Sequence, residues 1–237
     1  MKTNLIIFAW VIAGIFTGIT PTFAQREIRE VPVFTDISLR VPASLHVRQG
    51  DIQKVEVEAT RTALDELITE VNGRALVIRF PTRQLLNRNF DPGKINIYVT
   101  VPEINALMLT GSGDILAEDA LTTRIMDLNV SGSGSIILNQ LNADKVKAVI
   151  SGSGDIVLKD GKEADEFNAT ISGSGNIKAA SYEAREVSIR ILGSGNSYIY
   201  SDGNIQVKIA GSGSVYYSGN PNIDSSIAGS GKVVENN

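Results

Sequence analysis

Cysteine is absent from this chain of 237 residues, and histidine and tryptophan each occur once. Without cysteine there is no disulfide and no thiolate metal site, so burial and hydrogen bonding alone must stabilise the fold. Basic clusters are also lacking and the formal net charge is −4, which argues against a nucleic-acid partner. Catalytic signatures such as Gly-x-Ser-x-Gly, His-Glu-x-x-His or a phosphate-binding loop do not occur. We therefore predict no catalytic residue, no metal site and no cofactor.

Long apolar runs are also missing, except for one at the N-terminus. Lys2 precedes an apolar stretch over residues 5–19, and Pro21 and Thr22-Phe23-Ala24 follow it. A positive charge, an apolar run and a small-residue cleavage site in this order are typical of a secretion signal. A bilayer span needs about 20 apolar residues, so a membrane anchor is the weaker alternative. We predict that residues 1–24 are a signal peptide, that no membrane span remains after cleavage, and that the protein is periplasmic or extracellular.

Glycine, in contrast, is abundant, with 22 residues. The tripeptide Gly-Ser-Gly occurs seven times in the second half of the chain, at intervals of 21, 20, 21, 20, 18 and 18 residues. A period of about 20 residues indicates a stacked array, because so short a unit cannot bury a core alone. The central serines of the seven copies are Ser112, Ser133, Ser153, Ser174, Ser194, Ser212 and Ser230.

Aliphatic residues flank the tripeptide at a spacing of two. Two positions before the first glycine stand Leu109, Val130, Ile150, Ile171, Ile191, Ile209 and Ile227. Two positions after the second glycine stand Ile115, Ile136, Ile156, Ile177, Ser197, Val215 and Val233. A spacing of two indicates strands, and its recurrence in every copy indicates that each strand stacks on its counterpart in the next copy. The predicted fold is all-β: a parallel β-helix or β-solenoid with about 20 residues per coil.

Because Gly-Ser-Gly separates two strands of one coil, we interpret it as a corner, where glycine supplies the backbone freedom that a sharp bend needs. We expect the seven serine hydroxyls to form a ladder in which each donates a hydrogen bond to the next. The tripeptide is therefore predicted to be structural, with its serines bonded to one another and not to a substrate.

The first part of the mature chain lacks the repeat but alternates apolar and polar residues, as half-buried strands do. We expect residues 25–106 to form a β-rich segment that packs on or continues the solenoid of residues 107–237. Within this segment we predict a short helix over residues 62–70 with Thr62 as its N-cap. Asn72-Gly73 predicts a type I′ hairpin turn.

A mostly polar series directly follows the second glycine of each copy: Asp114, Ser135, Asp155, Asn176, Asn196, Ser214 and Lys232. Stacked Asp and Asn residues suggest a calcium-binding β-roll, but that repeat has a period of nine residues. Capping of the turns through local backbone N–H groups is the preferred interpretation. A polysaccharide hydrolase or lyase would need two carboxylates roughly 5–10 Å apart. Asp114 and Asp155 lie two coils apart, near the upper limit, and His46 has no nucleophile nearby in the sequence.

The next position along each strand should point outward, and it is mostly apolar. Its residues are Leu116, Ile137, Val157, Lys178, Tyr198, Tyr216 and Val234, and Tyr200 and Tyr217 extend the aromatic cluster. A continuous exposed apolar stripe usually marks an interface, and tyrosine is favoured in interfaces and in sugar stacking. We therefore predict a binding surface along this stripe. The alternative is that the N-terminal segment folds over it.

The repeats Ser-Gly-Ser-Gly-Asp-Ile at 151–156 and Ser-Gly-Ser-Gly-Asn-Ile at 172–177 resemble the head GIN domain family of auto-transporter adhesins, exported proteins common in Bacteroidetes. Gln49-Gly50-Asp51, Asn72-Gly73 and the strand Ala75–Phe80 strengthen the resemblance, which covers about residues 28–234. The resemblance implies a β-helical fold and a role in surface adhesion, and it brings no catalytic residues. The chain shows no membrane barrel of its own and no lipoprotein cysteine, so we expect a protein that is free in the periplasm or released.

Together these features predict a non-enzymatic exported β-solenoid that binds an unknown protein or glycan through an outer face. Self-association into a homo-oligomer is compatible with the same stripe. A carbohydrate-active enzyme and a purely structural component of the cell envelope remain as alternatives. A deep groove with paired carboxylates would favour the enzyme, and a flat apolar stripe would favour the binding protein.

Overall fold

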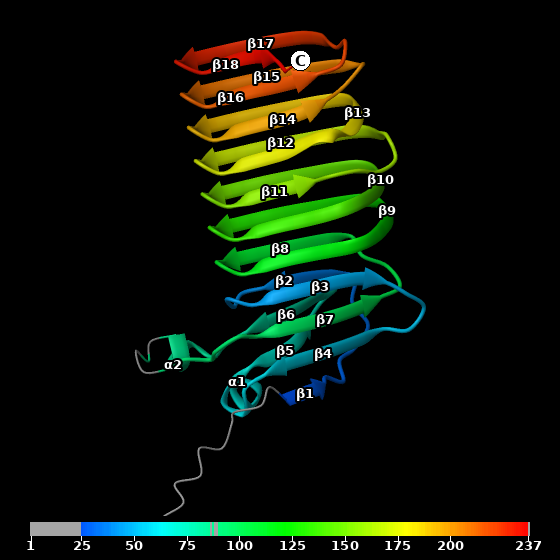
Figure 1. The fold of residues 1–237 in the computed structure, drawn as a ribbon, viewed down its shortest axis with the longest axis vertical. Coiled ribbons are helices and arrows are strands. Elements are labelled where there is room, and N and C mark those ends of the chain that lie inside the picture. The colour runs from blue at the N-terminus through cyan, green and yellow to red at the C-terminus, as the bar shows by residue number, and fades with distance from the viewer. Residues whose placement is uncertain (1–24, 86, 88–89, 237) are drawn as a thin grey trace, which may run out of the picture.

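The computed structural model describes residues 25–85, 87 and 90–236, and the predicted signal segment, residues 1–24, lies outside these. Strands account for 68% of the residues and helices for 4%, which confirms the all-β class. The strands stack in a single column, with the C-terminal strands at one end and the N-terminal strands at the other (Figure 1). No helix among the described residues is both long and apolar enough to cross a membrane.

The repeat region forms a two-sided parallel β-solenoid. Its strands are β8 (Ala106–Gly111), β9 (Asp114–Gly132), β10 (Ser135–Gly152), β11 (Asp155–Leu158), β12 (Ala164–Gly173), β13 (Asn176–Gly193), β14 (Asn196–Tyr200), β15 (Asn204–Gly211), β16 (Ser214–Ser218), β17 (Asn222–Gly229) and β18 (Lys232–Glu235). Three of them, β9, β10 and β13, run through a whole coil and belong to both sheets. The remaining coils divide between a strand on one sheet and a strand on the other. The predicted solenoid with about 20 residues per coil is confirmed.

Two aliphatic ladders fill the space between the sheets. The ladder before the corner runs from Leu109 through Val130 and Ile150 to Ile227, each residue paired in register with the next. The ladder after the corner runs in the same way from Ile115 to Val233. Most ladder side chains are fully buried, and burying an aliphatic side chain of this size contributes about 1.5–3 kcal/mol. The ladders are therefore the main source of stability.

The N-terminal strands extend both sheets, but not in chain order. The elements are β1 (Gln25–Ile28), β2 (Asp36–Leu39), β3 (Ser44–Gln49), β4 (Lys54–Ala59), α1 (Arg61–Glu66), β5 (Ile68–Asn72), β6 (Ala75–Arg79), α2 (Thr82–Leu85) and β7 (Asn96–Val101). β2 lies between β6 and β8, and β3 lies between β7 and β9, all parallel. The coil of β2 and β3 is thus sandwiched between two coils that follow it in the chain, as Figure 1 shows.

Antiparallel strands end the stack. β4 pairs antiparallel with β7, β1 pairs antiparallel with β4, and β5 forms an antiparallel hairpin with β6. The two-residue loop of the hairpin is Gly73-Arg74, because Asn72 still pairs with Ala75. Gly73 has a positive φ of 64°, but no described non-glycine residue has one. The type I′ turn predicted at Asn72-Gly73 needs two positive φ values, so that turn type is wrong although the hairpin forms. A change of strand direction prevents further parallel coils from being added at this end.

The predicted helix over residues 62–70 is wrong at both ends. The N-cap is Thr60, whose side chain accepts a hydrogen bond from the Ala63 backbone N–H at 3.2 Å, and the helix ends at Glu66. Residues 68–72 form β5 instead, because they pair with β6 and so gain ladder hydrogen bonds. Tertiary pairing here outweighs the modest helical preference of the segment.

Candidate functional site

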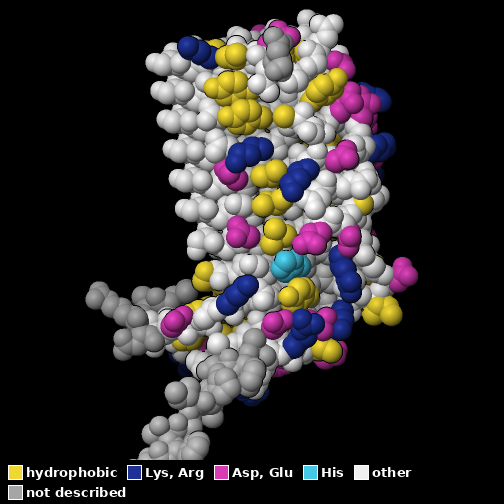
Figure 2. All heavy atoms as spheres, in the orientation of Figure 1, with side chains coloured by type: hydrophobic (Ala, Val, Ile, Leu, Met, Phe, Trp, Pro, Cys, Tyr) yellow, Lys and Arg dark blue, Asp and Glu magenta, His cyan; other side chains and the backbone are white. Residues whose placement is uncertain are grey.

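The Gly-Ser-Gly corner depends on both glycines, for different reasons. The first glycine of every copy has a positive φ, from 109° at Gly111 to 139° at Gly211, which side chains rarely tolerate. The second glycine is crowded by the neighbouring coil. A Cβ on Gly134 would lie 2.0 Å from the carbonyl oxygen of Gly113. The corner is therefore structural, and it forms a regular toothed ridge along one edge of the molecule in Figure 2.

The hydrogen bonds of this ridge are made by backbone groups, so the expected ladder of serine hydroxyls is wrong. The Ser133 and Gly134 N–H groups both donate to the Gly111 carbonyl, at 2.9 and 3.1 Å, and the same pair of bonds recurs in the following coils. Coils stack about 4.8 Å apart, whereas hydroxyl oxygens must approach to about 2.8 Å. None of the seven serine hydroxyls bonds to another in the described part of the chain. The serines are exposed and face solvent.

The polar row after the corner ties each coil to the next. Oδ1 of Asp114 accepts from the Ser135 backbone N–H at 3.2 Å, and Oδ1 of Asn196 accepts from the Ser214 N–H at 3.1 Å. Oδ1 of Asp155 accepts from both the backbone N–H and the side-chain amide of Asn176. The acceptors therefore reach N–H groups 18 to 21 residues further along the chain, in the next coil, and not the local backbone N–H groups that the capping interpretation expected. Across residues 25–85, 87 and 90–236 no three metal-ligating side chains gather into a group.

Asp155 has the most perturbed carboxylate of this row. Partial burial alone would raise its pKa, but hydrogen bonds from Lys178 and Asn176, together with the charge of Lys178, hold the pKa below its usual value. The Lys178 ammonium lies 2.6 Å from Oδ2 of Asp155. Asp155 is therefore engaged in holding coils together. Asp114, the other carboxylate of the candidate hydrolase pair, accepts only the Ser135 backbone N–H within the described part of the chain.

The apolar stripe lies on the outer face of one sheet. Leu116, Ile137 and Val157 occupy neighbouring strands in register, Lys178 follows, and Tyr198, Tyr216 and Val234 complete the column. Most of these side chains are half-buried because neighbours on the sheet shield them. Figure 2 shows the column running along the solenoid, open to solvent and flanked by charged side chains. The described N-terminal strands continue the stack and do not fold over it.

Two aromatic residues that sequence reasoning missed extend the stripe. His46 pairs with Leu116, and Tyr98 pairs with His46 on the far side. The two rings stack with centroids 5.1 Å apart, and the Arg26 guanidinium covers Tyr98 at 5.0 Å. A groove of about 340 Å³ surrounds them, lined also by Arg48 and Glu118. Aligning Val41-Pro42-Ala43 with Gly-Ser-Gly would have placed His46 in the column.

Tyr198 and Tyr216 of the stripe stack on each other, face to face. The rings of Tyr198 and Tyr216 are 4.9 Å apart and nearly parallel, at 10°, so that each covers a face of the other. They therefore present their edges and hydroxyls to solvent rather than an open platform. Tyr200 points outward by strand alternation, and its hydroxyl donates to Asp202 at 3.0 Å. That bond and the Asp202 charge raise the pKa of Tyr200.

Tyr217 does not belong to the stripe. It pairs with Ile199 and Glu235, and its side chain packs against the hydrophobic core of the last coils. Successive residues of a strand face opposite sides, so Tyr217 must point inward once Tyr216 points outward. The structure thus brings together every predicted stripe residue except this one.

Comparisons with solved structures identify the same fold in other proteins. A putative adhesin from Bacteroides fragilis superimposes with a TM-score of 0.84 at 23% identity, over 90% of this chain and 97% of that one. A putative lipid binding protein from Parabacteroides distasonis gives 0.75 at 24% identity, over 92% and 98%. A putative adhesin from Parabacteroides merdae gives 0.72 at 21% identity, over 92% and 98%. At these identities the likeness establishes the fold alone.

Among curated proteins, none matches this chain. A family profile does match, over residues 33–221, and its description is "Putative auto-transporter adhesin, head GIN domain". The match includes the N-terminal coils as well as six of the seven Gly-Ser-Gly corners. The chain therefore belongs to the auto-transporter adhesin head GIN domain family.

Proposed function

We propose that this protein is a non-enzymatic, exported binding protein of the bacterial cell envelope, and that it holds its partner along the apolar stripe. The observation that carries the proposal is the in-register column from Tyr98 through Leu116 to Tyr216 on an open sheet face. Large apolar side chains aligned on a solvated face usually mark an interaction site. Family membership supports an adhesin-like role, and the predicted signal peptide supports export.

The dimensions of the stripe favour an elongated partner. From Tyr98 to Val234 the column crosses nine strands, which is roughly 38 Å at about 4.8 Å per strand. One column is roughly 7 Å wide, because alternate residues of a strand are about 7 Å apart. The resulting area, on the order of 300 Å², is well below the ~800 Å² that each partner of a stable dimer buries. We therefore infer that self-association is not its main use, and that polar flanking residues contribute to binding.

The polar flanks offer such contacts. Lys178 interrupts the column, and the charged residues Glu118 and Arg48 line its N-terminal groove. Because the tyrosine rings are stacked on each other, the aromatic part of the stripe offers hydroxyl groups and ring edges to a partner. A ligand that lies along the column can use apolar contacts at its centre and hydrogen bonds at both sides, which is the usual anatomy of an interface.

A double substitution tests the proposal. Tyr198→Ser with Tyr216→Ser removes the two stacked tyrosines of the stripe, whereas Arg190→Ser with Lys208→Ser removes two long side chains from the other sheet of the same coils. Binding is measured against a glycan array, envelope proteins and bacterial phospholipid vesicles, the last because one structural relative is called a lipid binding protein. Losing two anchors of this kind should weaken binding about 30-fold or more.

The control variant should bind within about twofold of the unaltered protein, since its substitutions lie outside the stripe. The proposal would be contradicted if the tyrosine variant bound every glycan, protein and vesicle in the panel as well as the unaltered protein does. Turnover of any glycan on the array, followed as release of reducing ends, would instead support the enzyme alternative. High abundance and self-assembly without any ligand would support a structural role.

A further inference from the structure

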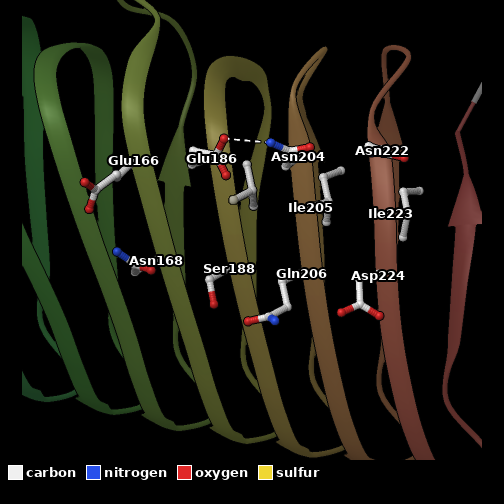
Figure 3. Close-up of a pocket in the computed structure, with 11 residues that line it drawn as sticks. Glu166, Asn168, Glu186, Ser188, Asn204, Ile205, Gln206, Asn222, Ile223 and Asp224 are labelled. Carbon is white, nitrogen blue, oxygen red and sulfur yellow. Dashed lines mark hydrogen bonds between the residues drawn. The ribbon is translucent and has the colours of Figure 1, made fainter.

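A second, chemically different surface lies on the opposite sheet. A groove of about 610 Å³ crosses the outer face of β12, β13, β15 and β17. Figure 3 shows its polar side chains in two parallel rows. One row contains Glu166, Glu186, Asn204 and Asn222. The other contains Asn168, Ser188, Gln206 and Asp224. Parallel register aligns the rows, so the groove repeats the same geometry about every 4.8 Å along the solenoid.

Most of these side chains have donors or acceptors that make no hydrogen bond within the described part of the protein. In one row Asn204 donates to Oε1 of Glu186 at 2.7 Å, and Glu166 is ion-paired with Lys145. Five other side chains make no hydrogen bond to the residues that the structure describes: Asn168, Ser188, Gln206, Asn222 and Asp224. Amide groups both donate and accept, and a hydroxyl does the same. The groove thus offers both donors and acceptors to a ligand.

The charge of the groove restricts what it can bind. Its lining includes three carboxylates, Glu166, Glu186 and Asp224, and no lysine or arginine. An anionic polymer would bring like charges together, which is unfavourable. Cations stand beyond the lining. Lys145 and Lys147 pair with Glu166 and Asn168 at one end of the rows, and Arg190 and Lys208 lie two residues further along the strands. The groove is therefore suited to an uncharged ligand rather than to a uronic-acid polymer or a nucleic acid.

The composition of the groove is also unlike that of a protein interface. The cores of protein interfaces are enriched in Tyr, Trp, Phe, Met and Arg, and depleted in Glu, Asp and Ser. No residue of the first group lines this groove, and all three of the second group do. We propose that the groove is a binding site for a linear, uncharged polysaccharide, whose repeated hydroxyl groups match the repeated amide, hydroxyl and carboxylate groups of the two rows.

Calorimetric titration of the whole protein with hexasaccharides tests this site. The probes are linear hexasaccharides of glucose, mannose and xylose, with a uronic-acid hexasaccharide as the charged comparison. At least one neutral probe should bind, and the uronic-acid probe should bind at least tenfold more weakly or not at all. Asn168→Ala with Gln206→Ala removes one amide from each of two strands and should weaken binding of the neutral probe about tenfold or more.

Asn129→Ala provides the matched control, because Asn129 is an exposed residue of the same sheet that lies outside the groove. Asn129→Ala should leave the affinity for the neutral probe unchanged, and so should Tyr198→Ser with Tyr216→Ser. A result that contradicts binding in the groove therefore does not contradict binding along the stripe. Thermal unfolding checks that each variant folds. No binding of any neutral probe, stronger binding of the uronic-acid probe, or unchanged binding by the Asn168 and Gln206 variant would overturn the proposal.

Discussion

The N-terminal region and the repeat region build the same two-sided column in different ways. In the repeats each coil stacks on the coil that precedes it in the chain, and the corner is always Gly-Ser-Gly. In the N-terminal region the coil of β2 and β3 is enclosed by coils that come later, and its corner is Val41-Pro42-Ala43. The column therefore needs a tight corner and aliphatic ladders, but it needs neither the tripeptide nor chain order.

This difference separates local from long-range assembly. Asp36 pairs with Ala106 and Ser44 pairs with Asp114, both 70 residues away. Repeat coils pair residues only about 20 positions apart, as in Ser135 with Asp155. Long-range pairing costs more loop entropy before it stabilises anything. We infer that the repeats can assemble by propagation, whereas the N-terminal coil joins only when β6 to β9 are in place.

The largest expected effect comes from glycine, which the two regions use for different purposes. Gly134→Val should cost about 4 kcal/mol or more of unfolding free energy, because even its Cβ would lie 2.0 Å from the Gly113 carbonyl oxygen. Gly73→Ala should cost only about 1 kcal/mol, since its φ is 64° but open space surrounds it. Denaturant unfolding measures both. Similar losses at the two sites would contradict the distinction.

A smaller effect, of opposite sign at two sites, is expected for buried serines of the repeats. Ser197 interrupts the aliphatic ladder, and its hydroxyl is buried with no partner among the described residues. Ser197→Ala should therefore raise stability by about 1 kcal/mol. The hydroxyl of Ser201, also buried, donates to the Ala184 carbonyl at 2.5 Å, so Ser201→Ala should lower stability by about 1 kcal/mol. Melting temperatures that shift in the same direction for both variants would contradict this account.

The smallest effect concerns the polar row after the corner. In this row the N-terminal coil has Ser44, and a later repeat coil has Asp155. The folded-state pKa of Asp155 is lowered, so its ionised form stabilises the protein above the unfolded pKa of about 3.9, and this is lost as pH falls through the folded pKa. Asp155→Asn should remove this part of the acid sensitivity, less than about 1 kcal/mol.

Lys178→Met should remove much of the same acid sensitivity, because it takes away a principal charged partner of Asp155. Unfolding free energies measured from pH 2 to pH 6 distinguish the variants. If the unaltered protein and Asp155→Asn lose stability in parallel over this range, the carboxylate is not coupled to folding as described.

The ladders and corners were predictable because they depend only on local periodicity. An aliphatic residue two positions from each glycine, as at Ile150 and Ile156, must face inward if Gly-Ser-Gly is a corner. Alternation then places Val157 and Tyr198 outward without any knowledge of the rest of the chain. The same rule puts Tyr217 inside, because its neighbour in the chain, Tyr216, points outward. Proximity to the other tyrosines in the sequence therefore does not place Tyr217 in the stripe.

Other features depended on distances and partners that periodicity does not contain. The predicted ladder of serine hydroxyls does not form, because the spacing between coils exceeds hydrogen-bonding distance. The backbone N–H of Ser133 donates to the Gly111 carbonyl instead. The predicted limits of the helix were wrong because residues 68–72 pair with β6, a strand that follows them in the chain. His46 joined the stripe only through an out-of-order coil. The polar groove was missed because its rows, such as Asn168 and Gln206, share no common residue type.

A repeat of about 20 residues was sufficient to derive a parallel β-solenoid, its aliphatic interior and the direction of most side chains, since stacking carries one coil's pattern into the next. Only the tertiary structure decided where the non-repeating strands insert, which hydroxyls find partners and which outward rows form a groove. These depend on contacts between segments far apart in the chain, whose energies no local pattern encodes.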